Sequence, residues 1–192
     1  MNIAMRKTVT LAEFLAWEDR QELKHEFDGV RVIAMSGGTA AHARIQRNLA
    51  VALQPRLRGG PCEFYGSDLK LLTAEETIRY PDGMIVCAAV ADNAKWVDNP
   101  IVVFEVLSPR TSKTDRFEKV REYQATPSVQ RYVMLEQDAP HAVVYRRDGD
   151  RWTHDIMLAD AALALPEIGV EFPLAELFEG IVFEGREDGE TA

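Results

Sequence analysis

Residues 101–107 read IVVFEVL, an apolar run that is interrupted by a single charged residue, Glu105. A continuous apolar run of this length is typical of a central β-strand that is buried on both faces of its sheet. An ionised carboxylate inside such a strand is costly in free energy unless it is paired or bound to a metal ion. The stretch therefore predicts the middle of a sheet and a functional carboxylate within it.

A second stretch, YPDGMIV at residues 80–86, predicts another strand with Asp82 at its start. Two acids that converge from neighbouring strands form a site suited to Mg²⁺ or Mn²⁺, because hard cations prefer carboxylate oxygens. Such a metal can activate water and stabilise the charge on a phosphate under attack. Two simpler explanations stay open: Asp82 is a turn residue after proline, or Glu105 forms a salt bridge with an arginine such as Arg79.

The segment after this strand predicts a helix from Asp115 to about Thr126. Asp115, Lys119 and Tyr123 recur at helical spacing and share one face. A lysine on that face can orient the attacking water or neutralise a transition-state phosphate. The alternative is an ordinary solvated helix, in which spacings such as Glu118–Glu122 lie at the surface.

The remaining pattern mixes helices with hairpins. Helices are expected at 10–19, 40–57 and 115–126, with Thr10, Thr39 and Thr114 as their N-caps, and a short closing helix lies within 172–180. Strands are expected at 62–72, 77–87, 101–107, 131–136, 141–147 and 151–158, with a hairpin over 25–35 that turns at Asp28-Gly29. This order is not a strict βαβ alternation, so we expect an α/β (α+β) fold with a mixed β-sheet flanked by helices.

Length and composition fit one globular domain. The chain has 192 residues, of which 46% are hydrophobic and 28% charged, a balance that argues against disorder. We expect a single domain over residues 1–184 and a flexible acidic tail over 185–192. The net charge of −9 argues against a large nonspecific nucleic-acid footprint. It does not exclude a nuclease, since a local basic groove can coexist with an acidic remainder.

Cysteine content and hydropathy indicate where in the cell the protein is expected to be located. Cys62 and Cys87 are expected to be reduced, buried thiols, with a disulfide between them as the alternative. No CxxC pair occurs, so a structural zinc site is not expected. The chain has no apolar run of the roughly 20 residues that span a bilayer and no signal-peptide pattern. We therefore expect a cytoplasmic protein that is not embedded in a membrane.

These stretches together resemble the Uma-two family of restriction-endonuclease-like proteins, which belongs to the PD-(D/E)XK nuclease superfamily. The resemblance rests on YPDGMIV, on EVLSP followed by D-x-x-x-K-x-x-x-Y, and on the earlier KHEFDGVRVIAMSGGTAAHARIQRNLA. It extends from about Thr10 to Phe178 and implies a restriction-endonuclease-like fold.

The resemblance also implies roles for individual residues. Asp82 matches the aspartate of the PD motif, and Glu105 matches the acidic member of the second motif. The superfamily's lysine normally lies two residues further on, where this chain has Leu107, and Lys119 in the following helix is the matching residue. Glu26 matches a family acid that can complete the metal shell, although a solvent-facing strand residue is the alternative.

Other matches are weaker. His42 matches a family histidine, but a merely capped or partly buried side chain is the simpler explanation. The SGGT loop before it could bind phosphate through helix amides, although a plain loop is expected. Gly83 stands where the family usually has an apolar residue, so we expect a weakened strand and a loosened Asp82. Three further residues are expected to be scaffolding around the site: Ser108, Asp115 and Tyr123.

The leading hypothesis is an Mg²⁺- or Mn²⁺-dependent endodeoxyribonuclease. Asp82 and Glu105 would hold the metal, and Lys119 and Glu26 would complete the catalytic set. DNA is the expected partner, whether foreign DNA, a transposon end or a repair intermediate, and a homodimer is the default form for cutting both strands. The rival hypothesis is a catalytically silent binding or assembly protein on a nuclease fold, which the acidic charge and Gly83 favour.

Overall fold

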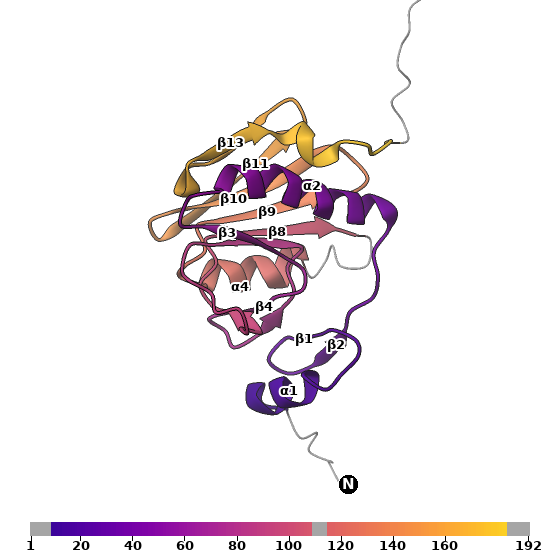
Figure 1. The fold of residues 1–192 in the computed structure, drawn as a ribbon, viewed down its shortest axis with the longest axis vertical. Helices are drawn as coiled ribbons and strands as arrows, with labels where there is room; N and C mark the ends of the chain where they lie inside the picture. The colour runs from indigo at the N-terminus through magenta and orange to yellow at the C-terminus, as the bar shows by residue number, and fades with distance from the viewer. Residues whose placement is uncertain (1–8, 109–114, 184–192) are drawn as a thin grey trace, which may run out of the picture.

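The computed structural model describes residues 9–108 and 115–183, and its centre is a six-stranded sheet (Figure 1). The strand order is β11-β10-β9-β8-β6-β3, in which β8 and β9 are parallel and the other neighbours antiparallel. All six residues of β8 are buried, which confirms the predicted central strand. The strand bounds are β3 Glu63–Gly66, β6 Gly83–Val86, β8 Val102–Leu107, β9 Arg131–Glu136, β10 His141–Asp148 and β11 Arg151–Leu158.

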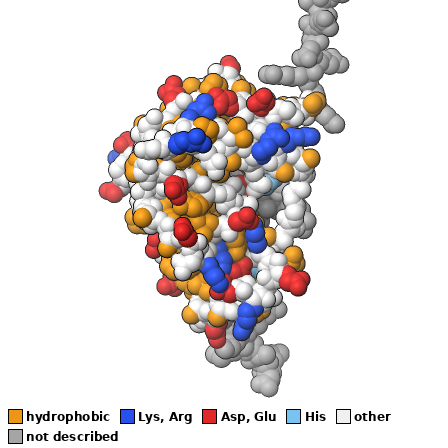
Figure 2. Space-filling model, viewed as in Figure 1, with side chains coloured by type: hydrophobic (Ala, Val, Ile, Leu, Met, Phe, Trp, Pro, Cys, Tyr) orange, Lys and Arg blue, Asp and Glu red, His pale blue; other side chains and the backbone are white. Residues whose placement is uncertain are grey.

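Helices and a small hairpin cover the two faces of this sheet. On one face, α2 (Ala40–Leu57) packs with β12 (Ala162–Leu165), β13 (Val170–Pro173) and the 3-10 turn η3 (Leu174–Phe178) around one apolar cluster. On the other face, α4 (Val120–Ala125) contributes to a second cluster. In the space-filling view from the same side, charged side chains of both signs are spread among apolar ones (Figure 2).

A second sheet joins the N-terminal part of the chain to the middle. Its order is β2-β1-β5-β4-β7, with bounds β1 His25–Phe27, β2 Val32–Ala34, β4 Lys70–Leu72, β5 Ile78–Arg79 and β7 Trp96–Val97. Helix α1 (Leu11–Glu18) packs against it, and Phe14 stacks on Phe27 at 5.1 Å between ring centroids. Thr10 caps α1 in a capping box with Glu13, as S/T-x-x-E patterns predict.

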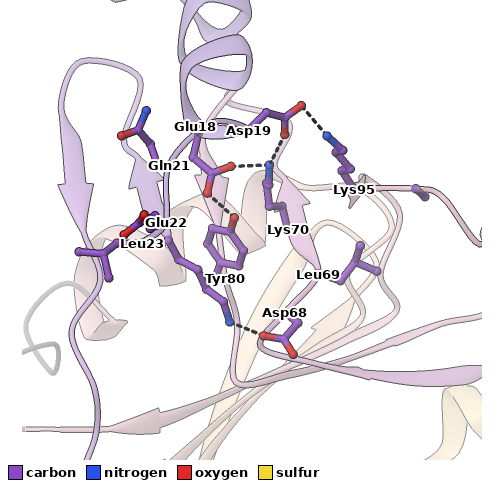
Figure 3. Close-up of a pocket in the computed structure, with 12 residues that line it drawn as sticks. Glu18, Asp19, Gln21, Glu22, Leu23, Asp68, Leu69, Lys70, Tyr80 and Lys95 are labelled. Atoms are coloured by element: carbon purple, nitrogen blue, oxygen red, sulfur yellow. Dashed lines mark hydrogen bonds and ion pairs between the residues drawn. The ribbon is translucent and has the colours of Figure 1, made fainter.

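A polar pocket of about 360 Å³ lies beside the end of α1 (Figure 3). Lys70 Nζ lies 2.6 Å from Glu18 Oε2 and 3.3 Å from Asp19 Oδ1, and the Tyr80 hydroxyl donates to Glu18 Oε1 at 2.6 Å. Lys95 lies 2.7 Å from Asp19 Oδ2. At the other side of the pocket, Lys24 is paired with Asp68. We call these seven residues the Lys70 network.

The secondary structure confirms most of the predicted elements. Helices 10–19 and 40–57 and the hairpin over 25–35 are present, with Thr10 and Thr39 as caps. The two long strands predicted at 62–72 and 77–87 each break into two shorter strands that belong to different sheets. Strands β7, β12 and β13 were not predicted, and the closing helix is the short 3-10 turn η3.

The predicted helix over 115–126 is present in an altered form. It opens as a π-helical turn, η1 (Asp115–Lys119), and continues as α4. A π-helical turn is wider than an α-helical turn, so it changes the direction in which the Lys119 side chain projects from the helix. Turns of this kind are frequent at functional sites. The predicted cap Thr114 and the acidic tail both lie outside the described residues.

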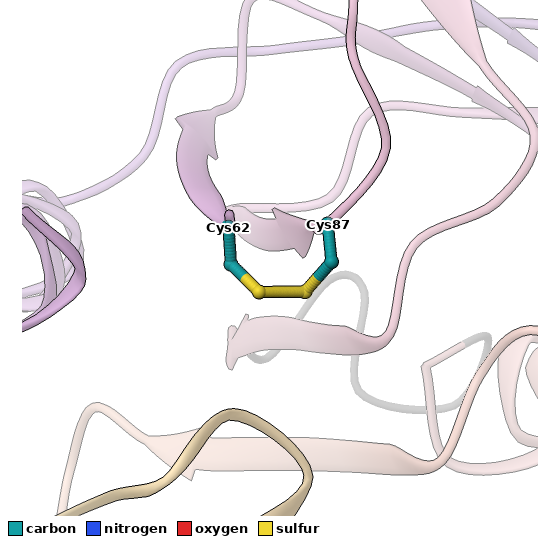
Figure 4. Close-up of a disulfide and its surroundings, with 2 residues drawn as sticks. All are labelled: Cys62 and Cys87. Atoms are coloured by element: carbon teal, nitrogen blue, oxygen red, sulfur yellow. A yellow bond between two sulfur atoms is a disulfide. The ribbon is translucent and has the colours of Figure 1, made fainter. Parts of the chain in front are cut away.

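The two cysteines form a disulfide, so the expectation of reduced thiols is wrong (Figure 4). Strands β3 and β6 pair with Glu63 opposite Val86, and one further step along this register sets Cys62 opposite Cys87. A separation of 25 residues does not reveal this pairing, because it depends on how the two predicted strands break and turn.

None of the helices that the structure describes is long and apolar enough to cross a membrane.

Candidate active site

Asp82 lies at the end of the central sheet and is held from three sides. Gln46 Nε2 on α2 donates to its Oδ1 at 2.6 Å, and the backbone N–H of Val106 donates to its Oδ2 at 2.6 Å. His42 Nε2, one turn before Gln46, lies 3.3 Å from the same Oδ2. These contacts fix the direction of the Asp82 carboxylate.

Glu105 faces the opposite helix layer. Its Oε1 accepts from Lys119 Nζ at 2.8 Å and from the Tyr123 hydroxyl at 2.9 Å. Both donors lie one turn apart on η1 and α4, as the i, i+4 spacing predicted. Strand pairing sets Gly83 opposite Phe104, and Asp82 precedes Gly83 at a bend just outside β6. Asp82 therefore meets α2 and the Val106 amide, whereas Glu105 meets η1 and α4.

Glu26 on β1 joins this group through Lys119. Lys119 Nζ lies 3.3 Å from Glu26 Oε1, so the ammonium sits between two carboxylates from different sheets. Arg79 donates to Glu26 Oε2 at 3.1 Å and to both oxygens of Glu122 at 2.6 and 2.7 Å. Arg79 has no exposed surface at all, and Lys119 is only 5% exposed.

Six buried residues form one connected group, and buried Asp82 lies beside it through the amide of Val106, the neighbour of Glu105 in β8. We call these seven residues the Glu105 cluster: Glu26, Arg79, Asp82, Glu105, Lys119, Glu122 and Tyr123. The four sequence-predicted catalytic residues, Glu26, Asp82, Glu105 and Lys119, all belong to it. Among the described residues, its four carboxylates face two permanently charged cations, Arg79 and Lys119, and the imidazole of His42, which is positive only when protonated, lies 3.3 Å from Asp82. The carboxylates therefore outnumber the cations in this part of the chain.

The cluster also shifts the pKa values of its members. Burial would raise the pKa of the Glu26 carboxyl, but the positive charges of Lys119 and Arg79 outweigh burial and hold this pKa below its ordinary value. Burial, and then the negative charge of Glu105, raise the pKa of the Tyr123 hydroxyl well above its ordinary value. Tyr123 therefore keeps its proton and donates it to Glu105 in a hydrogen bond.

Gly83, which was expected to loosen Asp82, is instead a packing requirement. A Cβ atom at this position would lie 2.7 Å from Cε2 and 2.9 Å from Cζ of Phe64 on β3. The strand pairs in register on both sides of Gly83, with Gly66 and Phe104 opposite it. The ring of Phe64 thus packs directly on the glycine, and Asp82 is held by the contacts described above.

Several sequence-based interpretations need correction. Arg79 pairs with Glu26 and Glu122 rather than with Glu105, and Glu122 is buried rather than at a solvated surface. Tyr123 contacts Glu105 directly through its hydroxyl, which agrees with the scaffolding role expected around the site. Ser108 follows the last residue of β8, and the side chain of Asp115 lies outside the described part of the chain.

The sequence-based predictions did not include Gln46 or the pairing of Arg79 with Glu26 and Glu122. The signal for Gln46 was its position one turn after His42 on the helix that the sequence already predicted. The signal for Arg79 was a lone cation in an otherwise apolar pair of strands. Neither signal names a partner, because both partners come from distant parts of the chain.

Among the described residues, no group of three or more His, Cys, Asp or Glu side chains is arranged to hold a metal ion. A site for Mg²⁺ does not require such a group, since this ion often takes one or two protein carboxylates and completes its shell with water and substrate phosphates. Asp82 and Glu105 carry the carboxylate oxygens that such an ion prefers.

Comparisons with known proteins agree with the geometry. The family model of Uma2, described as "Putative restriction endonuclease", matches residues 11–175. Two uncharacterized proteins of Synechocystis sp. are similar in sequence. Slr1290 is 33% identical over 175 residues, which cover 89% of this chain and 92% of that protein. Sll1609 is 32% identical over 155 residues, which cover 79% and 88%.

A solved structure shows the same fold. The crystal structure of "a putative nuclease belonging to DUF820 from Anabaena variabilis" superposes with a TM-score of 0.74 at 17% identity, over 91% of this chain and 99% of that one. The predicted restriction-endonuclease-like mixed sheet is thereby confirmed. The family match covers most of the chain, and the chain is therefore a member of the Uma2 restriction-endonuclease family.

Proposed function

We propose that this protein is a metal-dependent endonuclease that hydrolyses phosphodiester bonds in DNA. The observation that carries the proposal is the Glu105 cluster, in which a buried lysine lies between two carboxylates and the carboxylates outnumber the cations among the described residues. A structural ion-pair network has no need of surplus buried charge, because each unmatched carboxylate is costly to bury. A divalent cation would balance the surplus.

Mg²⁺ or Mn²⁺ would be held by Asp82 and Glu105, where it would supply polarisation of a phosphoryl oxygen and a lowered pKa for the attacking water. The chain's own residues do the rest. Gln46 and the Val106 amide keep Asp82 aimed, and Tyr123 keeps Glu105 aimed. Metal ligands that are oriented in this way are typical of working sites, and loss of such outer contacts usually weakens metal affinity or activity.

Lys119 is the candidate for stabilising the phosphate during attack. Its ammonium is held by Glu105 and Glu26, so it stays in the site without a substrate. As charge develops on the phosphate oxygens, this fixed donor can neutralise it, and its hydrogen bonds can orient the water. The burial of Lys119 favours catalysis over the silent binding or assembly protein, for which a lysine directed to solvent would be expected.

DNA as substrate, a cytoplasmic location and a two-fold dimer belong to this proposal. A dimer would place two Glu105 clusters on opposite strands of one duplex. Light scattering of the purified chain in solution, with and without a short duplex, tests the dimer. A monomer in both samples would contradict it and leave nicking of single strands as the activity.

The proposal is tested by nicking of supercoiled plasmid in Mg²⁺ and in Mn²⁺. We expect the wild type to produce open circles, and Asp82→Asn and Glu105→Gln to reduce the rate by about 10²-fold or more, as the loss of one strong electrostatic contact does elsewhere. Glu18→Gln, in the Lys70 network, is a matched control and should nick like the wild type. Equal nicking by all four proteins, or none by any, would contradict the proposal.

A further inference from the structure

Helix α2 has a charge opposite to that of the whole protein. The chain carries 31 acidic and 22 basic residues, with a net charge of −9. Within α2, three arginines occur and no aspartate or glutamate does: Arg44, Arg47 and Arg56. The longest helix that the structure describes is therefore a local basic element in an acidic protein.

Two of these arginines are available to an outside anion. Arg44 and Arg47 are exposed, and neither forms an ion pair with a carboxylate in the described ranges. The guanidinium of Arg47 donates only to the neutral amide oxygen of Asn48, at 2.9 and 3.2 Å. Arg56 differs, because it is paired with Glu176 at 2.8 Å and lies over an aromatic ring.

The same helix reaches the Glu105 cluster. His42 and Gln46, which alternate with the two arginines along α2, both contact Asp82. A helical turn rises about 5.4 Å, so the two exposed arginines lie within about one turn, along the helix axis, of the residues that hold Asp82. Phosphates of one DNA strand recur about every 3.4 Å along the duplex axis. This spacing is similar to the rise of about 4.5 Å between Arg44 and Arg47 along the helix axis.

The surface view agrees with this arrangement. Figure 2 shows two groups of Lys and Arg side chains across the upper half of the face that α2 crosses in Figure 1, with a histidine just below the right-hand group. Acidic side chains lie above these two groups, along the top edge of the molecule in the same view. The face therefore offers positive charge beside the site in a molecule that would otherwise repel nucleic acid.

We propose that α2 is the DNA-binding helix of this protein, and that Arg44 and Arg47 bind backbone phosphates next to the one held at the Glu105 cluster. This inference rests on the proposed endonuclease function and deepens it by naming the substrate contact. Arginine suits the role because its planar guanidinium binds phosphate through two parallel hydrogen bonds. Contacts of this kind position the duplex and carry no sequence information.

The test measures DNA binding without metal, so that it does not depend on cleavage. The full chain in EDTA is titrated into a fluorescein-labelled 20-base-pair duplex at several KCl concentrations, and anisotropy gives the affinity. The α2 variant is Arg44→Gln/Arg47→Gln. The control is Arg20→Gln/Arg151→Gln, which removes the same total charge from exposed positions on α1's flank and on β11.

Each lost phosphate contact lowers the slope of log affinity against log salt by about 0.9. We therefore expect the α2 variant to bind at least about tenfold more weakly at low salt and to lose about 1.8 from that slope. The control should keep the wild-type slope. Arg44→Lys/Arg47→Lys, which keeps the charge, should keep most of the slope and shows that a loss in the Gln variant is not misfolding.

Three outcomes overturn the proposal. In the first, the α2 variant keeps the wild-type salt slope. In the second, the control loses as much of the slope as the α2 variant does. In the third, the wild type does not bind the duplex at all. In each case, metal-dependent nicking by the wild type would still support the endonuclease, so failure of the α2 proposal and failure of the proposed function are distinguishable.

Discussion

Two charge networks lie in this protein, and they differ in burial and in balance: the Lys70 network is partly exposed, whereas the Glu105 cluster is buried. In the Lys70 network, three paired carboxylates, Glu18, Asp19 and Asp68, are matched by three lysines. In the Glu105 cluster, four carboxylates face the permanent charges of Arg79 and Lys119 and the titratable His42 within the described part of the chain. A balanced network needs nothing from outside, whereas an unbalanced one calls for a cation. We therefore propose the Glu105 cluster as the functional site and the Lys70 network as a structural one.

The largest expected effect on stability comes from removing Arg79, the cation of the Glu105 cluster that has no exposed surface. Arg79→Met leaves Glu26 and Glu122 buried and opposed only by Lys119, so we expect a loss of about 3–5 kcal/mol in the free energy of unfolding. Urea unfolding measures it. Lys95→Met in the Lys70 network should have a much smaller effect, because Lys95 is 61% exposed and its pair is screened by water.

A double variant sharpens this prediction. Arg79→Met/Glu122→Leu removes the cation together with its principal partner, so it should be more stable than Arg79→Met alone. The coupling between residues in direct contact is commonly about 0.5–3 kcal/mol. Additive losses in the double variant would show that Arg79 stabilises the fold through something other than its carboxylates.

A smaller effect is expected at Gly83. Gly83→Ala drives a methyl group into the ring of Phe64, and overpacking of this kind costs about 1–3 kcal/mol. Phe64→Leu in the same chain should restore most of the loss by vacating that space. The unfolding free energies of the two single variants and the double variant form the test, and an unrescued double variant would contradict the packing explanation.

The smallest effect concerns acid stability, and here the two networks should behave alike. Interactions hold the pKa of Glu26 below its ordinary value of 4.5, and burial of Glu18 is likewise outweighed by its hydrogen bonds from Lys70 and Tyr80. A carboxyl with a lowered folded-state pKa contributes stability above its unfolded pKa, and this contribution is lost as the pH falls through the folded pKa. Stability should therefore decline below about pH 4.5.

The test for this prediction is the unfolding free energy from about pH 6 to about pH 3 in Glu26→Gln and Glu18→Gln. Each variant removes one linked carboxyl, so each should show a flatter decline than the wild type. A variant whose profile parallels that of the wild type would show that its carboxyl is not linked to folding.

The sequence allowed the centre of the fold to be predicted because its signals are local. An apolar run with one glutamate located β8, and Thr39 located the start of α2. Where a strand breaks depends on its neighbours, so the change of sheet at Ser67-Asp68 was not predictable. The same limit applies to the disulfide, whose cysteines meet only after β3 and β6 pair.

In the candidate site, too, residues with a local signal in the sequence could be predicted, and residues defined by distant contacts could not. Glu105, Asp82 and Lys119 were predictable from an anomalous charge, a motif and a helical spacing. Gln46 and Arg79 were not, because a side chain's partner across 36 or 43 residues leaves no mark in local spacing. The charge imbalance also required the structure, since it depends on which acids are buried together.

The central claim is that the Glu105 cluster holds a divalent cation and the Lys70 network does not. Titration of the full chain with Mn²⁺, followed by electron paramagnetic resonance of the free ion, tests it directly. We expect about one Mn²⁺ ion bound per chain in the wild type and in Glu18→Gln, and weak or absent binding in Asp82→Asn and Glu105→Gln. Equal binding by all four proteins, or loss of binding in Glu18→Gln alone, would contradict it.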